Sequence, residues 1–184
     1  MSTTTERRLR LTRPHVAALL DAGLIEEARY ELCDGELLEK MPQKKSHATA
    51  CRRTTHLLGD QFGRDRVGSQ APIVLDELNE PEPDVFVTRL AVEDYPDNLS
   101  ASEVVLVVEV SDATLRTDRT EKAERYAAAG IPEYWIVAVN ERQVIVHRQP
   151  SLGIYGLVQT LGESDTVVPL AAPSLPLSVR DLLP

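Results

Sequence analysis

Hydrophobic and polar residues along the middle of the chain fall into blocks that predict strands and helices in turn. The block at 103–110 reads EVVLVVEV and is apolar on both faces, which is typical of a central strand covered on both sides. Other apolar runs predict strands at 67–75, 84–88, 133–139 and 143–147, with shorter candidates at 155–158 and 167–168.

Helical spacing and capping residues indicate four helices around these strands. Thr12 and Ser46 can each cap a helix at its start, and Gly130 can end the helix that follows the central strand. The predicted helices cover 12–21, 47–62, 117–129 (or 118–129) and 178–183.

An Asp34-Gly35 pair lies between two strand-like runs at 30–33 and 36–39. Glycine tolerates the positive φ of a tight turn, so this pattern predicts a β-hairpin. The chain is therefore expected to form a single α/β domain of the α+β type over 1–184. We expect a mixed central sheet flanked by helices, with an added N-terminal hairpin, added C-terminal strands and a flexible start at 1–10.

Strand order brings three polar residues to one edge of the predicted sheet. Asp84 begins one strand and Glu109 lies near the end of the next, and sequential strands joined by a loop pair antiparallel by default. The helix that leaves from the same edge carries Lys122 in its first turns. We therefore expect these three side chains to converge, unless Glu109 and Lys122 merely form a buried ion pair.

The formal net charge of −9 constrains which partners the chain can bind. It argues against broad, non-specific binding to nucleic acid, which requires a basic surface. It leaves room for a local basic groove, or for a site where metal ions offset the acidic groups.

The two cysteines, Cys33 and Cys51, are too few for a disulfide framework and lack zinc-site spacing. We expect free thiols in a reducing cytoplasm. No apolar run is long enough to span a bilayer, and the first residues carry basic side chains without the apolar stretch of a secretory signal.

Two carboxylates at one sheet edge can share a hard divalent cation, most plausibly Mg²⁺ or else Mn²⁺. Such a cation lowers the pKa of bound water and stabilises charge on a phosphoryl oxygen, and a nearby ammonium group can assist. Asp84, Glu109 and Lys122 therefore suit phosphodiester hydrolysis. A charge within the otherwise apolar run at 103–110 is costly unless it is paired or metal-bound, which makes Glu109 the most informative of the three.

Several segments together resemble the Uma2 family (DUF820) of the restriction-endonuclease-like PD-(D/E)xK superfamily. The resemblance runs from about Tyr30 to the end of the chain. The matching segments are GEL at 35–37, His47, PEPDVFV at 81–87, VVEVSDAT at 107–114 and DRTEKAERYAAAGIPEYWIV at 118–137.

The resemblance implies a restriction-endonuclease-like core with Asp84 and Glu109 as metal ligands. It also implies that Lys122 is the superfamily lysine, moved onto the helix, because Ser111 stands where the commoner spacing places that lysine. Members of the Uma2 family share this departure. The resemblance further suggests Glu36 as an additional acidic group of the catalytic site, with His47 close by.

These secondary assignments have structural alternatives. Glu36 follows a hairpin turn, where a residue is usually a solvated strand end. His47 could cap or pack in the first turn of its helix, and Ser111 could belong to the metal's outer shell or cap the following turn. A nucleophilic Cys51 or Cys33 with His47 or His56 lacks an accompanying nucleophile elbow or oxyanion loop.

Two functions from different classes follow. The first is a Mg²⁺- or Mn²⁺-dependent endonuclease that hydrolyses phosphodiester bonds of DNA, with no membrane partner. The second is a catalytically inactive binding or scaffold domain with the same fold, which the net charge favours. Apolar strands and the added hairpin could supply the interface of a homodimer.

Overall fold

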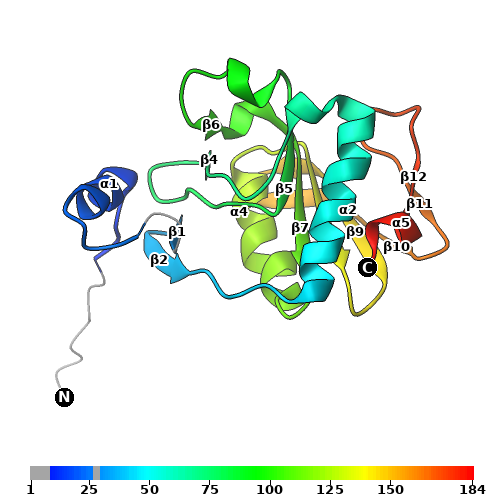
Figure 1. Cartoon of the computed structure of the whole chain (residues 1–184), viewed down its shortest axis with the longest axis horizontal. Helices are drawn as coiled ribbons and strands as arrows, with labels where there is room; N and C mark the ends of the chain where they lie inside the picture. Colours follow the sequence, from blue (N-terminus) through cyan, green and yellow to red (C-terminus); the bar gives the residue numbers. More distant parts are fainter. Residues whose placement is uncertain (1–8, 27–29) are drawn as a thin grey trace.

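The computed structural model describes residues 9–26 and 30–184 of the chain. Its centre is a six-stranded mixed sheet in the order β10-β9-β8-β7-β5-β3 (Figure 1). Neighbours pair antiparallel except β7 and β8, which are parallel. The strands are β3 (Val67–Gly68), β5 (Val85–Thr88), β7 (Val104–Ser111), β8 (Glu133–Ala138), β9 (Gln143–Ser151) and β10 (Ile154–Gly162). The predicted α+β fold with a mixed central sheet is confirmed.

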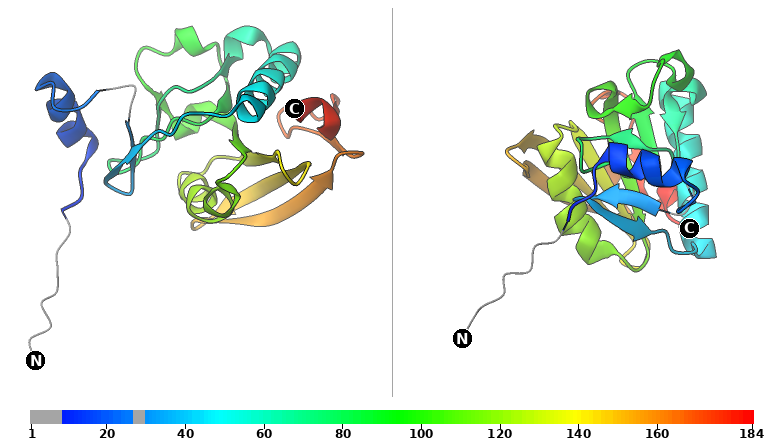
Figure 2. Two further views of the ribbon diagram at one scale, coloured as in Figure 1. Left: turned by 60° about the horizontal axis from the view of Figure 1, so that its bottom comes forward. Right: turned by 90° about the vertical axis from the view of Figure 1, so that its left-hand side faces the viewer.

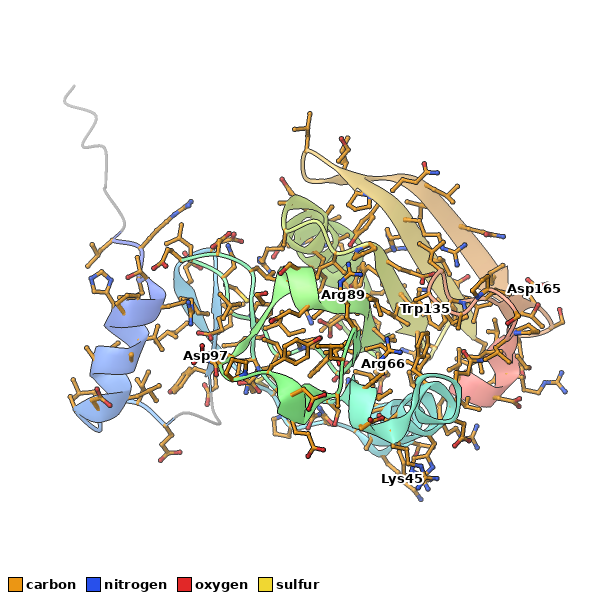
Figure 3. All side chains as sticks on the ribbon, turned by 90° about the horizontal axis from the view of Figure 1, so that it is seen from above. Lys45, Arg66, Arg89, Asp97, Trp135 and Asp165 are labelled. Carbon is orange, nitrogen blue, oxygen red and sulfur yellow. The ribbon has the colours of Figure 1, made fainter. Side chains whose placement is uncertain are left out.

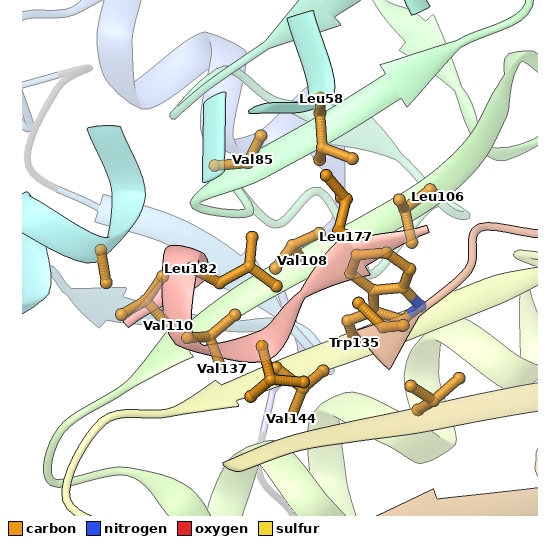
Figure 4. Packing of buried hydrophobic residues seen from close by; sticks show 14 of the residues in the cluster. Leu58, Val85, Leu106, Val108, Val110, Trp135, Val137, Val144, Leu177 and Leu182 are labelled. Atoms are coloured by element: carbon orange, nitrogen blue, oxygen red, sulfur yellow. The ribbon is translucent and has the colours of Figure 1, made fainter. Parts of the chain in front are cut away.

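Helices cover both faces of this sheet, which explains why β7 is apolar on both sides. On one face, α2 (Lys45–Phe62) and α5 (Val179–Leu182) pack over the strands, and Leu58 and Leu182 join Val108 in one core cluster (Figure 4). On the other face, Val107 packs in a second cluster that includes Tyr126. Residues 107 and 108 thus face opposite layers, as the alternation along a strand requires.

The second layer is one irregular helical segment. It consists of α3 (Leu115–Thr117), a π-helical turn (Asp118–Lys122) and α4 (Ala123–Ala128). The helix predicted after the central strand therefore exists, but it begins at Leu115, and one turn of it is π-helical. A π-turn inserts an extra residue into the helix and is frequent at functional sites.

The N-terminal hairpin forms as the sequence predicts. β1 (Tyr30–Cys33) pairs antiparallel with β2 (Glu36–Glu39), and Asp34 and Gly35 have φ values of 51° and 75°. Before it, α1 (Arg13–Asp21) is capped by Thr12 and stands beside the hairpin, away from the central sheet (Figures 1 and 2). Of the predicted flexible start at 1–10, residues 1–8 lie outside the described part of the chain.

The strand predicted at 67–75 is wrong as a single element. Its first residues form β3, whereas β4 (Ile73–Val74) pairs in parallel with β6 (Leu99–Ser100) in a separate two-stranded sheet. Gln70 takes a φ of 51°, and Pro72 has no backbone N–H to donate. Together they break the ladder between the two pieces.

Other predicted boundaries also shift. Ser46 does not cap α2, because the cap residue is Lys44 and Ser46 Oγ instead donates a hydrogen bond to Asp112 Oδ2 at 2.7 Å. The candidate strand at 155–158 is part of the much longer β10, and the candidate at 167–168 is β11 (Thr166–Val167), which pairs with β12 (Leu177–Ser178). Short 3₁₀ turns cover Arg64–Arg66, Val92–Asp94 and Ala101–Glu103. Among the described helices, none combines the length and the apolar character that crossing a membrane requires.

β3 and β5 approach so closely at Gly68 that no larger residue fits there without a shift. Gly68 pairs with Phe86, and a Cβ added at Gly68 would lie 2.1 Å from Cζ of the buried Phe86 ring. We expect Gly68→Ala to lower the free energy of unfolding in urea by ~1–3 kcal/mol, because the ring or the strand must move. Gly156→Ala, whose added Cβ meets nothing closer than 3.4 Å, should cost nothing measurable. Equal stability of the two variants would show that β3 is free to shift.

Candidate active site

Asp84 and Glu109 lie side by side at one end of the β5–β7 pair. Val85 pairs with Val108, so the residue just before β5 faces Glu109 across the strands. The backbone N–H of Val110 donates a hydrogen bond to Asp84 Oδ2 at 2.8 Å, which fixes this carboxylate against β7. The predicted antiparallel order of the two strands therefore brings the two carboxylates together in the structure.

Lys122 reaches Glu109 from the π-helical turn. Its Nζ lies 2.9 Å from Glu109 Oε2 and 3.4 Å from Asp118 Oδ1. One turn later, the hydroxyl of Tyr126 donates a hydrogen bond to Glu109 Oε1 at 2.8 Å. The irregular helix thus supplies one partner to each oxygen of the buried carboxylate. The sequence predicts the convergence of Lys122 with Glu109, but not the contact from Tyr126.

Burial dominates the electrostatics of this pair. Burial raises the pKa of Glu109, with Asp84 and Asp118 adding to the rise, whereas the charge of Lys122 opposes it. Burial lowers the pKa of Lys122, but the attraction of Glu109 and Asp118 outweighs that effect and raises the pKa above its ordinary value. Lys122 therefore stays an ammonium ion at neutral pH, so it can stabilise negative charge but cannot accept a proton.

Two buried oxygens beside Glu109 lack a hydrogen-bond partner among the described residues. They are Ser111 Oγ, at the end of β7, and Asp118 Oδ1, to which Lys122 is the nearby cation. Ser111 is almost fully buried, and its hydroxyl makes no capping hydrogen bond in this part of the chain. Buried oxygens of this kind are usually satisfied by ordered water or an ion.

His47 contacts Asp84 from the first turn of α2. Its Nε2 lies 3.1 Å from Asp84 Oδ2, and its Nδ1 lies 3.3 Å from Cys51 Sγ. Burial lowers the pKa of His47, but the hydrogen bond and charge of Asp84 outweigh it, so the pKa is raised. The structure therefore places His47 beside the carboxylates, where the sequence had left packing or capping as alternatives.

Asp84, Glu109, Lys122 and His47 all line a cavity of about 580 Å³ between the hairpin, α2 and the end of β7. Carboxylates outnumber ammonium groups in its wall by six to three, a formal charge of −3. The carboxylates belong to Glu31, Glu39, Glu82, Asp84, Glu109 and Asp112, and the ammonium groups to Lys40, Lys44 and Lys122.

The hairpin brings Glu31, and not Glu36, to the cavity. Glu36 is exposed beside the turn and is not among the residues that line the cavity. Glu31 pairs with Leu38, two residues further from the turn, and its side chain contributes to the potential at Lys122. Arg125 holds the turn itself through two hydrogen bonds to Asp34 Oδ2, at 2.8 and 3.1 Å. Side chains alternate along a strand, and this alternation puts both glutamates on the same face of the hairpin. Only their distance from the turn therefore distinguishes the glutamate that lines the cavity from the one that does not.

Comparisons with known proteins bear on this geometry. A solved structure of an Anabaena variabilis protein, described as a putative nuclease belonging to DUF820, superposes with a TM-score of 0.67. It is 18% identical in sequence, over 88% of this chain and 94% of that protein, so the likeness shows a shared fold. No curated protein sequence matches the chain. The sequence profile of the Uma2 family, described as "Putative restriction endonuclease", matches residues 19–180, and the chain therefore belongs to the Uma2 family.

Proposed function

We propose that this chain is a divalent-metal-dependent nuclease that hydrolyses phosphodiester bonds of DNA. The observation that carries the proposal is the placement of Glu109. The residue is 3% exposed within an apolar strand, yet it lines an acidic cavity together with Asp84 and Lys122. Membership of a family described as "Putative restriction endonuclease" supports nucleic acid as the substrate class.

The donor set of the cavity fits a hard divalent cation. Asp84 and Glu109 offer carboxylate oxygens, the ligands that Mg²⁺ and Mn²⁺ prefer. A cavity wall with a formal charge of −3 repels a phosphodiester unless cations offset it. We therefore assign metal binding to Asp84 and Glu109, with Glu31 as a third acidic group and Ser111 and His47 in the outer shell.

A cation held there lowers the pKa of a bound water and stabilises charge on a phosphoryl oxygen. The chain itself supplies a positive charge beside the phosphate and holds the two carboxylates in fixed positions. Lys122 supplies a fixed ammonium group beside the cavity, where it stabilises negative charge that develops on the phosphate. Tyr126 and the N–H of Val110 hold Glu109 and Asp84 in place, and such pre-positioning reduces the reorganisation that the reaction requires.

Exposed cations on and just before α2 could contact the DNA backbone despite the net charge of −9. Lys44, Lys45 and Arg52 are exposed on or just before the N-terminal half of α2, and Figure 3 labels Lys45 there. Basic side chains of this kind bind phosphates without reading sequence. Of these three, Lys44 lines the cavity, whereas Lys45 and Arg52 would hold the DNA backbone outside it.

A second candidate function is that of a catalytically inactive binding or scaffold domain, which could act as a homodimer. It is favoured by the pairing of the cavity's ammonium groups, since Lys40 is paired with Glu82 and Lys44 lies 3.4 Å from Asp112. Under this alternative, Asp84 and Glu109 bind no divalent cation. Calorimetric titration of the protein with Mg²⁺ and Mn²⁺ separates the two functions.

Removing the charge of any of the three central groups should strongly slow DNA cleavage. We expect Asp84→Asn, Glu109→Gln and Lys122→Met each to lower the rate of plasmid nicking in Mg²⁺ or Mn²⁺ by roughly 10²-fold or more, because each removes charge that the transition state needs. Glu163→Gln is the matched control, since Glu163 pairs with Arg142 on the surface, outside the cavity.

Circular dichroism must show that the variants are folded, because Glu109→Gln leaves Lys122 with less compensation. Cleavage that survives in folded Asp84→Asn and Lys122→Met would contradict this assignment of the site. A wild-type protein that neither cleaves DNA nor binds either cation would favour the scaffold function.

The hairpin gives a second prediction, which distinguishes its two glutamates. We expect Glu31→Gln to lower the cleavage rate or the Mg²⁺ affinity by roughly 10-fold, the size of effect seen for groups that support a metal site. Glu36→Gln should stay within about twofold of the wild type, because its side chain lies outside the cavity. The opposite order of effects would show that Glu36 is the hairpin's functional acid.

A further inference from the structure

His47, Cys51 and Asp84 form a cluster of three side chains with mixed chemistry at the back of the cavity. His47 and Cys51 are one turn apart on α2, and Asp84 lies just before β5. One ligand atom from each side chain lies within 4.8 Å of the other two. Within residues 9–26 and 30–184, no other group of His, Cys, Asp and Glu side chains meets this condition.

The three donors match a borderline-soft transition metal better than they match Mg²⁺. Imidazole nitrogen, thiolate sulfur and carboxylate oxygen are all established zinc ligands, whereas thiolate is foreign to a magnesium site. In a tetrahedral zinc site with bonds of ~2.0–2.3 Å, ligand atoms lie roughly 3.3–3.8 Å apart. His47 faces Asp84 through Nε2 and Cys51 through Nδ1, and a single ion takes only one of these ring nitrogens. The three donor atoms, which lie within 4.8 Å of one another, therefore have to close by about 1 Å and the imidazole has to turn for all three to bind one ion.

The cluster also has an open side. His47 and Asp84 line the cavity, whereas Cys51, one turn further along α2, is half-buried and does not line it. A bound ion would thus have three protein ligands and one position that faces the cavity. Three protein ligands with an open fourth position is the arrangement of accessible zinc sites, as opposed to closed structural ones.

The contacts from Cys51 to His47 and from His47 to Asp84 also suggest an alternative to metal binding, in which Cys51 acts as a nucleophile. Cys51 Sγ faces His47 Nδ1, and His47 Nε2 faces Asp84, as in a nucleophile–base–acid chain. Cys51, however, is not among the cavity-lining residues, so a substrate there cannot reach its sulfur. Burial also raises the pKa of the Cys51 thiol, the reverse of what an activated cysteine shows.

We propose that His47, Cys51 and Asp84 form a binding site for a thiophilic divalent ion of the zinc class, separate in ligand chemistry from the Mg²⁺ site. Asp84 belongs to both sites. An ion held by His47 and Cys51 draws on the carboxylate that the Mg²⁺ site needs and brings a second positive charge next to it. Zn²⁺ bound there therefore inhibits Mg²⁺-dependent cleavage, a consequence that rests on the proposed nuclease function.

Cobalt spectroscopy tests the site without any reference to activity. Co²⁺ replaces Zn²⁺ in tetrahedral sites, and its thiolate complexes absorb in the near ultraviolet. We expect one equivalent of Co²⁺ to give this thiolate absorption in the wild type and in Cys33→Ala, which removes the other, buried cysteine of β1. Cys51→Ser and Cys51→Ala should lose the absorption, and Zn²⁺ should displace Co²⁺ from the wild type.

The second part of the test measures the affinity for Zn²⁺ and the inhibition of cleavage by Zn²⁺. We expect Cys51→Ser to weaken Zn²⁺ binding, measured by calorimetry, by at least the roughly 10- to 100-fold that even outer-shell partners of a metal contribute. It should retain Mg²⁺-dependent cleavage and require a correspondingly higher Zn²⁺ concentration for inhibition.

The proposal is overturned if folded wild-type protein gives no thiolate absorption with Co²⁺, or if Cys51→Ser keeps it. It is also overturned if an active wild type and Cys51→Ser are inhibited by the same Zn²⁺ concentration. A protein that binds Co²⁺ through Cys51 but never cleaves DNA would refute the proposed function and leave this metal site standing.

Discussion

The burial of the Glu109 carboxylate near the end of the apolar central strand β7 is the constraint on which the rest of this site depends. A charge at this depth is costly unless other groups compensate for it. Lys122 and Tyr126 each contact one of its oxygens, and both come from the irregular helix that follows β7. The position of that helix, and the π-turn within it, is therefore tied to one acidic residue of the central strand.

Local patterns were sufficient to predict most elements, and contacts between distant segments account for the failures. The apolar run of β7 and the turn at Asp34 and Gly35 were found because their causes lie within a few residues. Ser46 donates its hydrogen bond to Asp112, which lies 66 residues away in the sequence. A local sequence pattern cannot predict such a contact. The meeting of Asp84 with Glu109 was predictable because antiparallel order alone decides it. The cluster around Cys51 was not, since it depends on how α2 packs against β5.

Charge distribution reconciles an acidic chain with an anionic substrate. The cavity wall is itself acidic, so the proposed nuclease depends on cations to admit a phosphodiester, whereas exposed basic residues near the start of α2 offer the DNA backbone a contact outside it. The same acidity explains why Lys122 is held as a cation. It also makes Asp84 the residue where two kinds of metal ion would compete, one for oxygen ligands and one for His47 and Cys51.

The most direct test of this account is a crystal structure of the protein soaked with Mn²⁺, examined by anomalous scattering. The account predicts an anomalous peak at the cavity within ~2.2 Å of carboxylate oxygens of both Asp84 and Glu109, with Lys122 still beside Glu109. A peak elsewhere, or Mn²⁺-soaked crystals that diffract well and show no peak at these two carboxylates, would contradict the central claim that they form a metal site.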